Sequence, residues 1–206
     1  NGEDLPYEKV VLATGASSFL PPIENLRTAN NVIGLRNLDD AIRIKEIAPK
    51  VKNIIILGAG LVGVDAMAGL LDYDAKVTMI EMGDRILPLQ LDHYAANVYI
   101  ERLKEEGVDF RFNVRAEKVI VDENNNPVAI KLNTGEEVPG ELIIACTGVR
   151  SNVGFLEGSG IECDKFGLIF NPKGETNVKH VYGAGDISGR NPIWPTAVKE
   201  GLIAAN

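Results

Sequence analysis

The chain has 206 residues, 45% of them hydrophobic, and carries a formal net charge of −8 at pH 7. This size and composition suffice for one or two hydrophobic cores, and the negative charge argues against nucleic acid or an anionic membrane as a partner. No apolar run approaches the roughly 20 residues of a membrane-spanning helix, and Cys146 and Cys163 form neither a disulfide framework nor a metal-binding spacing, which together predict a cytoplasmic protein without a metal site.

The beginning of the chain predicts one strand, one loop and one helix. Residues 7–13 form the strand, and the small residues 14–18 form a turn after it. Residues 23–37 are interrupted by asparagine and glycine, which is typical of a loop. Asn37 is then a suitable N-cap for a helix over residues 38–48, where apolar side chains recur at helical spacing.

The most informative stretch reads NIIILGAGLVG and starts at Asn53. Its apolar run, residues 54–57, is typical of a strand that is buried on both faces. The pattern G-x-G-x-x-G follows at once, and residues 64–73 then predict a helix. Strand, glycine turn and helix in this order are the context in which the pattern indicates dinucleotide binding.

Each glycine of this pattern has a physical task. Gly58 permits a tight turn, Gly60 leaves room for a pyrophosphate beside the backbone, and Gly63 lets the helix pack closely on the strand. The first amides of the helix, at the positive end of its dipole, then face the phosphates. A glycine turn alone is a weak signal, since such turns are common.

A second signal strengthens the prediction. Residues 76–80 predict the next strand, and Glu81 stands at its end, about 20 residues beyond the glycine turn, where an acid accepts hydrogen bonds from an adenosine ribose. The competing interpretation is an ordinary solvated acid at a strand end. The predicted dinucleotide-binding residues are Gly58, Ala59, Gly60, Leu61, Val62, Gly63 and Glu81.

Glu81 also predicts NAD(H) rather than NADP(H). A site for NADP(H) needs a cation for the 2′-phosphate, and residues 82–84 supply none, although Arg85 lies near enough to turn inward. A phosphate charge about 4 Å from Glu81 would be repelled by about 4 kcal/mol at an effective dielectric constant near 20. Even a fraction of that repulsion gives a clear preference for NADH.

The next segment repeats the alternation of helix and strand. Residues 82–91 form a loop, Asp92 caps a helix that runs to about Glu106, Gly107 ends it, and residues 108–112 form a third strand. Strands joined by helices fit parallel β-α-β units. The apolar face of the helix is predicted to be Ala95, Tyr99 and Leu103.

The pattern then changes from helical to strand-like. Residues 116–122 and 128–132 are strands separated by an asparagine-rich turn, and they predict a three-stranded meander before the buried strand 141–146. Residues 194–206 return to helical spacing. The predicted fold class is therefore α/β, with a Rossmann-like parallel sheet and a three-stranded β-meander.

Four short motifs occur in a characteristic order: Ala13-Thr14-Gly15, the glycine turn, Cys146-Thr147-Gly148 and the sequence YGAGD at residues 182–186. This ordered set resembles the flavin-dependent pyridine nucleotide–disulfide oxidoreductases, and most of all the branch of NADH oxidase, coenzyme A disulfide reductase, rubredoxin reductase and nitrite reductase. The resemblance covers essentially the whole chain. It implies hydride transfer from nicotinamide to FAD and then onward to an acceptor.

The resemblance implies an NAD(H)-binding domain at residues 38–146, inserted in an FAD-binding domain whose pieces are residues 1–37 and 147–206. Asp186 would bind the flavin ribityl hydroxyls, and residues 194–197 would lie near the isoalloxazine at the start of a helix whose dipole favours the reduced flavin. Without the resemblance, Asp186 is an ordinary turn aspartate. The further cofactor-binding residues that the resemblance implies are Thr14, Gly15, Thr147, Gly148, Gly185, Asp186, Trp194 and Ala197.

The chain also departs from the family pattern. The motif that holds the FAD pyrophosphate and the redox cysteine are expected upstream of Asn1, and the dimerisation domain, with a possible homodimer, after Asn206. Cys146 and Cys163 are then structural. Asp65 stands where the family usually carries glutamate near the nicotinamide, and it is either a shorter form of that acid or an acid of the helix surface.

Two functions of different class follow from these residues. The first is the central part of an FAD-dependent oxidoreductase that binds NADH, in which this chain alone lacks a complete flavin site and supplies no catalytic side chain. The second is a non-catalytic NAD-binding module. A Rossmann dehydrogenase that acts directly on a carbonyl is a weaker third reading, because the sequence offers no constellation of proton donors. The electron acceptor is not identified.

Overall fold

The structure, a computed structural model, describes residues 2–206. The chain divides into two compact units. Residues 18–148 form one of them, called the large unit below. Of the described residues, 2–17 and 149–206 form the other, called the small unit. Within the described residues, no helix combines the length and the apolar character that a membrane span requires.

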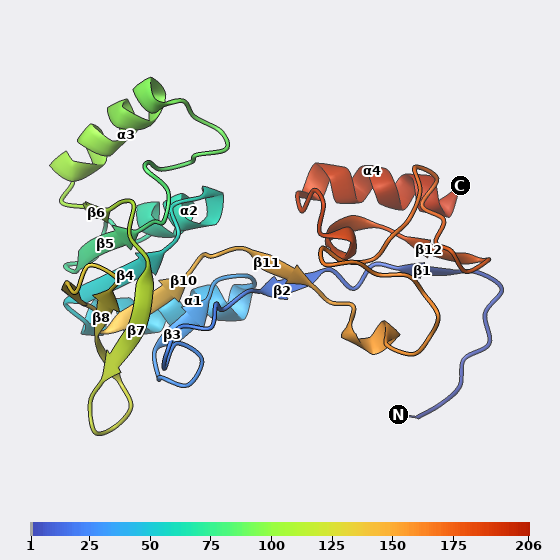
Figure 1. Ribbon diagram of the computed structural model, residues 1–206, viewed down its shortest axis with the longest axis horizontal. Helices are drawn as coiled ribbons and strands as arrows, with labels where there is room; N and C mark the ends of the chain where they lie inside the picture. The colour runs from blue at the N-terminus through green and yellow to red at the C-terminus, as the bar shows by residue number, and fades with distance from the viewer. Residues whose placement is uncertain (1) are drawn as a thin grey trace. The chain divides into compact units, whose positions relative to one another are not determined.

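A parallel sheet is the centre of the large unit (Figure 1). Its strand order is β3-β10-β4-β5-β6, and every neighbouring pair runs parallel. The central strand β4 is followed by the glycine turn, as predicted. The strands are β3 (Val32–Gly34), β4 (Asn53–Leu57), β5 (Lys76–Ile80), β6 (Asp109–Arg111) and β10 (Leu142–Ala145).

Helices cover one face of this sheet. They are α1 (Leu38–Ile47), α2 (Leu61–Ala68) and α3 (His93–Glu105), with the short 3-10 helix η1 (Ala48–Lys50) after α1. Ile54 and Ile56 of β4 point into the core on this side, where Met67 of α2 and Ile100 of α3 also lie. Successive strand residues face opposite sides of a sheet, so Ile55 must point to the other face.

A three-stranded antiparallel sheet covers that second face (Figure 1). It consists of β7 (Ala116–Val121), β8 (Pro127–Leu132) and β9 (Glu137–Pro139). Ile55 packs there with Val119 and Ile130 in a second core. The strands of the parallel sheet are therefore buried on both faces, and the predicted combination of a Rossmann-like parallel sheet with a three-stranded meander is confirmed.

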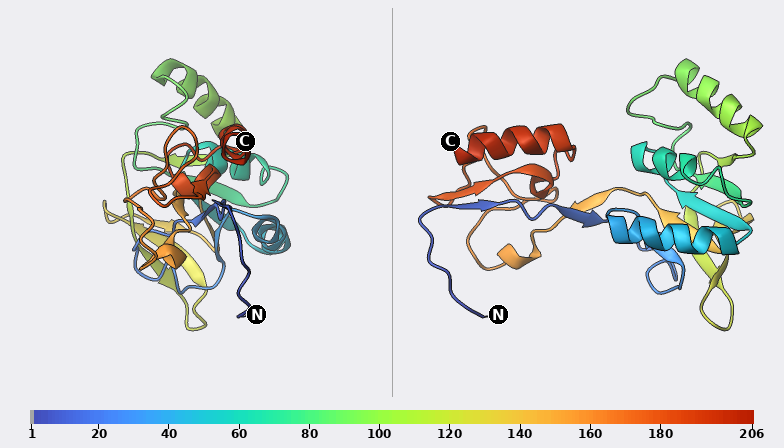
Figure 2. Two further views of the ribbon diagram at one scale, coloured as in Figure 1. Left: turned by 90° about the vertical axis from the view of Figure 1, so that its right-hand side faces the viewer. Right: turned by 180° about the vertical axis from the view of Figure 1, so that it is seen from behind.

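The small unit is built on short strand pairs (Figure 2). β1 (Val10–Leu12) runs parallel to β12 (Val181–Gly183), and β2 (Ala16–Ser18) pairs with β11 (Val149–Ser151). Its buried cluster is Leu156, Leu168 and Ile187. The remaining elements are η2 (Gly154–Leu156), η3 (Gly185–Ser188) and α4 (Trp194–Ala205).

Two predicted helices need correction. The glycine-turn helix spans Leu61–Ala68 rather than 64–73, because it starts directly after Gly60 and ends at Gly69. Beyond Gly69 the amides of Leu70 and Tyr73 donate to carbonyls three residues back, which is turn geometry.

In α3 the predicted caps are correct, since Asp92 accepts from the Ala95 amide and Gly107 follows the helix with φ +89°. Of the predicted apolar face, Leu103 packs against the core but Tyr99 is exposed, and the buried residues of the helix are Ala96 and Ile100.

Two predicted loop regions contain strands. β3 lies in the segment expected to be a loop, and β2 lies in the segment expected to be a turn. Each has only three residues and becomes a strand through its partner, β10 for β3 and β11 for β2. The segment between β2 and α1 belongs to the large unit, where Leu26 is fully buried. The assignment of cofactors to residues 1–37, 38–146 and 147–206 stays a prediction.

Candidate functional site

The glycine turn joins β4 to α2 in a tight space. Gly58 has φ +98°, and a Cβ there would stand 2.5 Å from the Cys146 carbonyl oxygen. A Cβ on Gly63 would overlap the Gly58 carbonyl oxygen. Both positions therefore require glycine, Gly58 for its backbone conformation and for the neighbouring strand end, and Gly63 for the close approach of helix and turn.

Gly60 differs from these two glycines because it faces open space. A Cβ there would meet no atom within 4 Å, and Gly60 is the N-cap of α2 without a side-chain cap. The Val64 amide is the one that donates back to the Gly60 carbonyl oxygen, at 3.0 Å. The preceding amides, of Leu61, Val62 and Gly63, have no acceptor within the helix. Amides without an acceptor in the helix thus lie next to a glycine at which an added Cβ would touch nothing.

Glu81 is tied directly to this turn. Its Oε2 accepts from the Ala59 amide at 2.8 Å and its Oε1 accepts from the Gly83 amide at 2.7 Å. The end of β5 is joined to the same turn, because the Gly58 amide donates to the Ile80 carbonyl oxygen at 2.8 Å. A carboxylate has about four lone-pair sites, so these bonds orient Glu81 and leave it able to accept further hydrogen bonds.

Arg85, the cation that was expected to be able to turn inward, is engaged in its own loop. Its guanidinium donates to the carbonyl oxygens of Pro88 and Leu91 and pairs with Asp84 at 2.7 Å. His93 Nε2 lies 3.4 Å from Arg85 Nη1. Residues 82–84 therefore give Glu81 no cationic neighbour, and Arg85 is bound to other partners in its own loop.

Asp65 is exposed on α2, and no hydrogen bond or ion pair of its carboxylate occurs among residues 2–206. Both interpretations of Asp65, an acid near nicotinamide and an acid of the helix surface, stay open. No group of three or more metal-ligating side chains gathers in the described part of the chain.

In the small unit, two of the motifs meet at one sheet edge. β1 and β12 are parallel, and their carboxyl ends continue into Thr14-Gly15 and into Gly185-Asp186. The carboxyl ends of parallel strands are where α/β sheets bind ligands. Asn152, which the sequence did not single out, holds Thr14 in place: its Nδ2 donates to the Thr14 carbonyl oxygen, and the Thr14 hydroxyl donates to the Asn152 carbonyl oxygen.

Glu200 is a second residue that the sequence analysis missed. Its Oε2 accepts from the Gly185 amide at 2.7 Å, so α4 holds the backbone immediately before Asp186. Ala197 lies on the same side, since a Cβ on Gly185 would stand 3.3 Å from the Ala197 Cβ. Trp194, at the start of α4, is 76% exposed. No local pattern distinguishes Glu200 from any other helix-surface acid.

The second Thr-Gly pair belongs to the large unit. The Thr147 hydroxyl donates to the Phe19 carbonyl oxygen at 2.6 Å, and the Phe19 amide donates to the Gly148 carbonyl oxygen at 2.9 Å. Thr147 and Gly148 therefore anchor the incoming chain after β2 against the end of β10.

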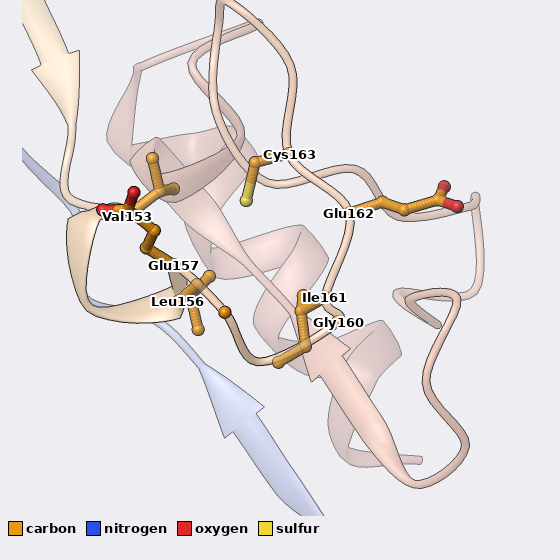
Figure 3. Close-up of a pocket in the computed structure, with 8 residues that line it drawn as sticks. Val153, Leu156, Glu157, Gly160, Ile161, Glu162 and Cys163 are labelled. Carbon is orange, nitrogen blue, oxygen red and sulfur yellow. The ribbon is translucent and has the colours of Figure 1, made fainter.

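The two cysteines are free and differ in their surroundings. Cys146 lies beside the glycine turn, and burial raises the pKa of its thiol to about 12. Cys163 is exposed and borders an open hollow of about 530 Å³ (Figure 3). Burial and the neighbouring Asp164 charge raise the pKa of the Cys163 thiol as well. Thiols that are protonated at neutral pH are poor nucleophiles, which fits the predicted structural role of both.

Comparison with known proteins decides the family. The sequence profile described as "Pyridine nucleotide-disulphide oxidoreductase" matches residues 1–201. The chain belongs to this family. The predicted resemblance is thus confirmed, and the matched range includes the ordered motifs at residues 13–15, 58–63, 146–148 and 182–186.

Individual relatives agree with this assignment. The chain is 32% identical to dihydrolipoyl dehydrogenase of Acholeplasma laidlawii, covering 99% of the chain and 59% of that protein. It is 29% identical to NADH oxidase of Methanocaldococcus jannaschii, covering 99% and 47%.

Among solved structures, an NAD-dependent persulfide reductase from A. fulgidus superposes with a TM-score of 0.89 at 28% identity, covering 98% of this chain and 39% of that one. The chain spans about half the length of the curated relatives it matches.

Proposed function

We propose that the large unit binds NAD(H) through the glycine turn and Glu81, as part of an FAD-dependent oxidoreductase that passes a hydride from nicotinamide to FAD. The observation that carries the proposal is the contact between Glu81 and the Ala59 amide, at 2.8 Å. It supports the proposal because ribose and pyrophosphate adjoin in a dinucleotide, so an acid that accepts from the ribose and amides that bind the pyrophosphate need to lie side by side.

The residues present fit a dinucleotide. Gly60 borders open space, whereas Gly58 and Gly63 are closed in by backbone, so space for a phosphate occurs where the motif requires it. The amides of Leu61, Val62 and Gly63 would bind the pyrophosphate, and Glu81 would accept from the ribose hydroxyls. The nicotinamide supplies the hydride and the flavin accepts it, while the protein binds and orients both.

NADH is the proposed nucleotide, rather than NADPH. Glu81 is negative where a 2′-phosphate would lie, and Arg85 is engaged by Asp84, Pro88 and Leu91. A phosphate charge about 4 Å from Glu81 would be repelled by about 4 kcal/mol at an effective dielectric constant near 20. The M. jannaschii relative is named NADH oxidase, which supports the same choice.

For the small unit we propose a contribution to the FAD site of the whole protein. Thr14, Gly15, Gly185 and Asp186 lie at the carboxyl ends of β1 and β12, and α4 begins at Trp194. The Asp186 carboxylate would accept from ribityl hydroxyls, and the positive end of the α4 dipole would favour an anionic reduced flavin. The electron acceptor and a homodimer belong to the whole protein and are not specified by these residues.

Calorimetric titration of the purified chain tests the proposal. NADH should bind clearly more tightly than NADPH, and Glu81→Ala should weaken NADH binding and narrow the difference. Glu105→Gln, on the exposed surface of α3, is the matched control and should change neither affinity. Tighter binding of NADPH would mean that a cation binds the 2′-phosphate and that the role proposed for Glu81 is wrong.

A second function, binding without turnover, has its own supporting observation. The glycine turn is complete within the large unit. Among its described residues, the small unit has one small cluster of buried hydrophobic side chains, formed by Leu156, Leu168 and Ile187. The chain by itself would then be an NAD-binding module. Flavin absorption of the purified chain, and reduction of a dye acceptor with NADH, distinguish the two: both signals together would exclude the non-catalytic function.

A further inference from the structure

Arg85 closes the loop of residues 82–91 from within. Its Nε donates to the Leu91 carbonyl oxygen and its Nη2 to the Pro88 carbonyl oxygen, both at 3.1 Å, and its Nη1 pairs with Asp84 Oδ1 at 2.7 Å. The side chain is 20% exposed. A planar guanidinium holds several acceptors in one fixed geometry, which a lysine ammonium does not. Arg85 therefore joins three separate points of the loop.

The loop contains a residue in an unfavourable conformation. Leu87 has φ +48°, in the left-handed region that costs a bulky residue about 1–2 kcal/mol. Such residues persist where the surroundings over-determine them, and they cluster at ligand sites. Here Arg85 donates to the carbonyl oxygens of Pro88 and Leu91, which follow Leu87 by one and four residues.

Leu87 in turn contacts the glycine turn. Its amide donates to the Ala59 carbonyl oxygen at 2.8 Å, while the Ala59 amide donates to Glu81. The peptide groups on both sides of Ala59 are therefore held, one by Leu87 and the other by Glu81. Gly83, whose amide holds the other oxygen of Glu81, directly precedes Asp84 in the chain.

We propose that Arg85 is a positioning residue for dinucleotide binding, which fixes the Ala59 peptide and the Glu81 carboxylate without contacting the nucleotide. This inference rests on the proposed function of the same site. By its ion pair with Asp84, Arg85 restrains the neighbouring Gly83, whose amide donates to one oxygen of Glu81. By its hydrogen bonds to Pro88 and Leu91, it restrains Leu87, whose amide donates to Ala59.

The alternative role for Arg85 is a direct ligand of a 2′-phosphate. That role requires the guanidinium to leave two carbonyl oxygens and a carboxylate, all of which would lose a donor. The loss is costly at the half-buried residues Pro88 and Leu91, because water replaces a missing donor less well there. The two roles differ in a measurable way, because a phosphate ligand affects NADPH alone and a positioning residue affects NADH and NADPH by the same factor.

A double-mutant cycle in the 206-residue chain tests the inference. Arg85→Gln, Glu81→Ala and the double variant are titrated with NADH and with NADPH, and the thermal midpoint of each variant is recorded. We expect Arg85→Gln to weaken NADH binding about tenfold, and to weaken it less, about threefold, when Glu81 is already alanine, because that background removes the route through Glu81 and keeps the one through Leu87. Arg85→Lys should restore less than half of the lost affinity.

Arg102→Gln is the matched control. Arg102 also makes two ion pairs, with Glu105 and Glu106, but on the exposed surface of α3. The Arg102→Gln variant should bind NADH with unchanged affinity. This result would show that the weaker binding of Arg85→Gln does not come from the loss of an arginine charge in general.

The outcomes separate the two proposals. Equal losses from Arg85→Gln in both backgrounds, or a loss confined to NADPH, would overturn the positioning role and leave the nucleotide site intact. Absence of NADH binding by the unaltered chain would overturn both. If Arg85→Gln does not fold, Asp84→Ala removes one of the three contacts and takes its place in the cycle. We expect a loss of about threefold that disappears with Glu81→Ala, and additivity there would equally overturn the inference.

Discussion

Ala59 and Glu81, 22 residues apart in the sequence, are joined by a hydrogen bond of 2.8 Å from the backbone amide of one to the carboxylate of the other. This bond links the glycine turn after β4 to the end of β5, the two points that the proposed dinucleotide would bridge. It forms because β4 and β5 are adjacent parallel strands whose carboxyl ends reach the same edge. The acid is thereby oriented before any ligand arrives.

Glu81→Gln should destabilise the protein although it keeps the shape of the side chain. A carboxylate accepts from the amides of Ala59 and Gly83 with its two oxygens, whereas an amide side chain offers one oxygen and directs an NH₂ group at the other donor. A backbone donor left unpaired costs about 1–3 kcal/mol when buried, and we expect about 1 kcal/mol for this half-buried site. Urea unfolding of Glu81→Gln against Glu105→Gln measures it. Equal midpoints for the two variants would contradict the bond's contribution.

Alanine substitutions at two glycines of one motif should separate folding from binding. Gly63→Ala places a methyl group on the Gly58 carbonyl oxygen, and overpacking of this kind typically costs about 1–3 kcal/mol. Gly60→Ala adds a methyl group in open space at φ −77° and should leave stability nearly unchanged. It should still weaken NADH binding at least about tenfold, roughly 1.4 kcal/mol, because the methyl group would occupy the space proposed for the pyrophosphate. Thermal midpoints and NADH titrations of both variants check this, and a Gly60→Ala variant that binds normally would place the phosphates elsewhere.

Cys146 should make stability depend on pH in the alkaline range. Its thiol ionises near pH 9.0 when unfolded, and burial raises the pKa to about 12 in the folded protein. The stabilisation is therefore complete below pH 9.0 and is lost as the pH rises toward 12, because only the unfolded state releases the proton. We expect the free energy of unfolding to fall by up to about 1.4 kcal/mol per pH unit in this window. Urea unfolding of the unaltered protein and of Cys146→Ala at several pH values tests it, and parallel pH profiles would show that Cys146 does not contribute.

The two thiols should also differ in reactivity. An aromatic disulfide reagent is expected to label Cys163 in the native protein and Cys146 only after unfolding, since Cys163 is exposed and Cys146 is not. Labelling of Cys163 should accelerate with rising pH, because burial and the charge of Asp164 raise its pKa and thiolate is the reactive form. Cys163→Ser should remove the native-state signal. Rapid labelling that survives this substitution would show that Cys146 is accessible.

Glu200→Ala should loosen the segment that leads into Asp186. The Glu200 carboxylate accepts from the Gly185 amide at 2.7 Å, and a hydrogen bond to a charged group contributes about 1.5–3 kcal/mol when it is well shielded. We expect about 1–2 kcal/mol for this half-buried bond. Glu200→Gln retains a carbonyl acceptor and should cost less. Hydrogen exchange at the Gly185 amide reads the effect directly: equal protection in all three proteins would mean that Glu200 is only a surface acid.

Local signals in the sequence determined the centre of this fold. The apolar run of β4, the glycine pattern and the capping residues Asn37 and Asp92 act on neighbours within a few positions, so their consequences can be derived from the sequence alone. The family motifs are equally local. These signals predicted the parallel sheet, the meander, the glycine turn and the acid at Glu81.

Only the tertiary structure decided the remaining contacts. β3 is a three-residue strand because β10 lies beside it, and Glu200 differs from other helix acids only because Gly185 folds against it. The same holds for Arg85, whose engagement by Pro88 and Leu91 has no signature in the sequence. Hydrogen bonds of this kind form only after folding has placed distant chain segments or loop residues next to one another. A linear pattern specifies each strand, turn and cap, but the packing of those elements specifies which donor meets which acceptor.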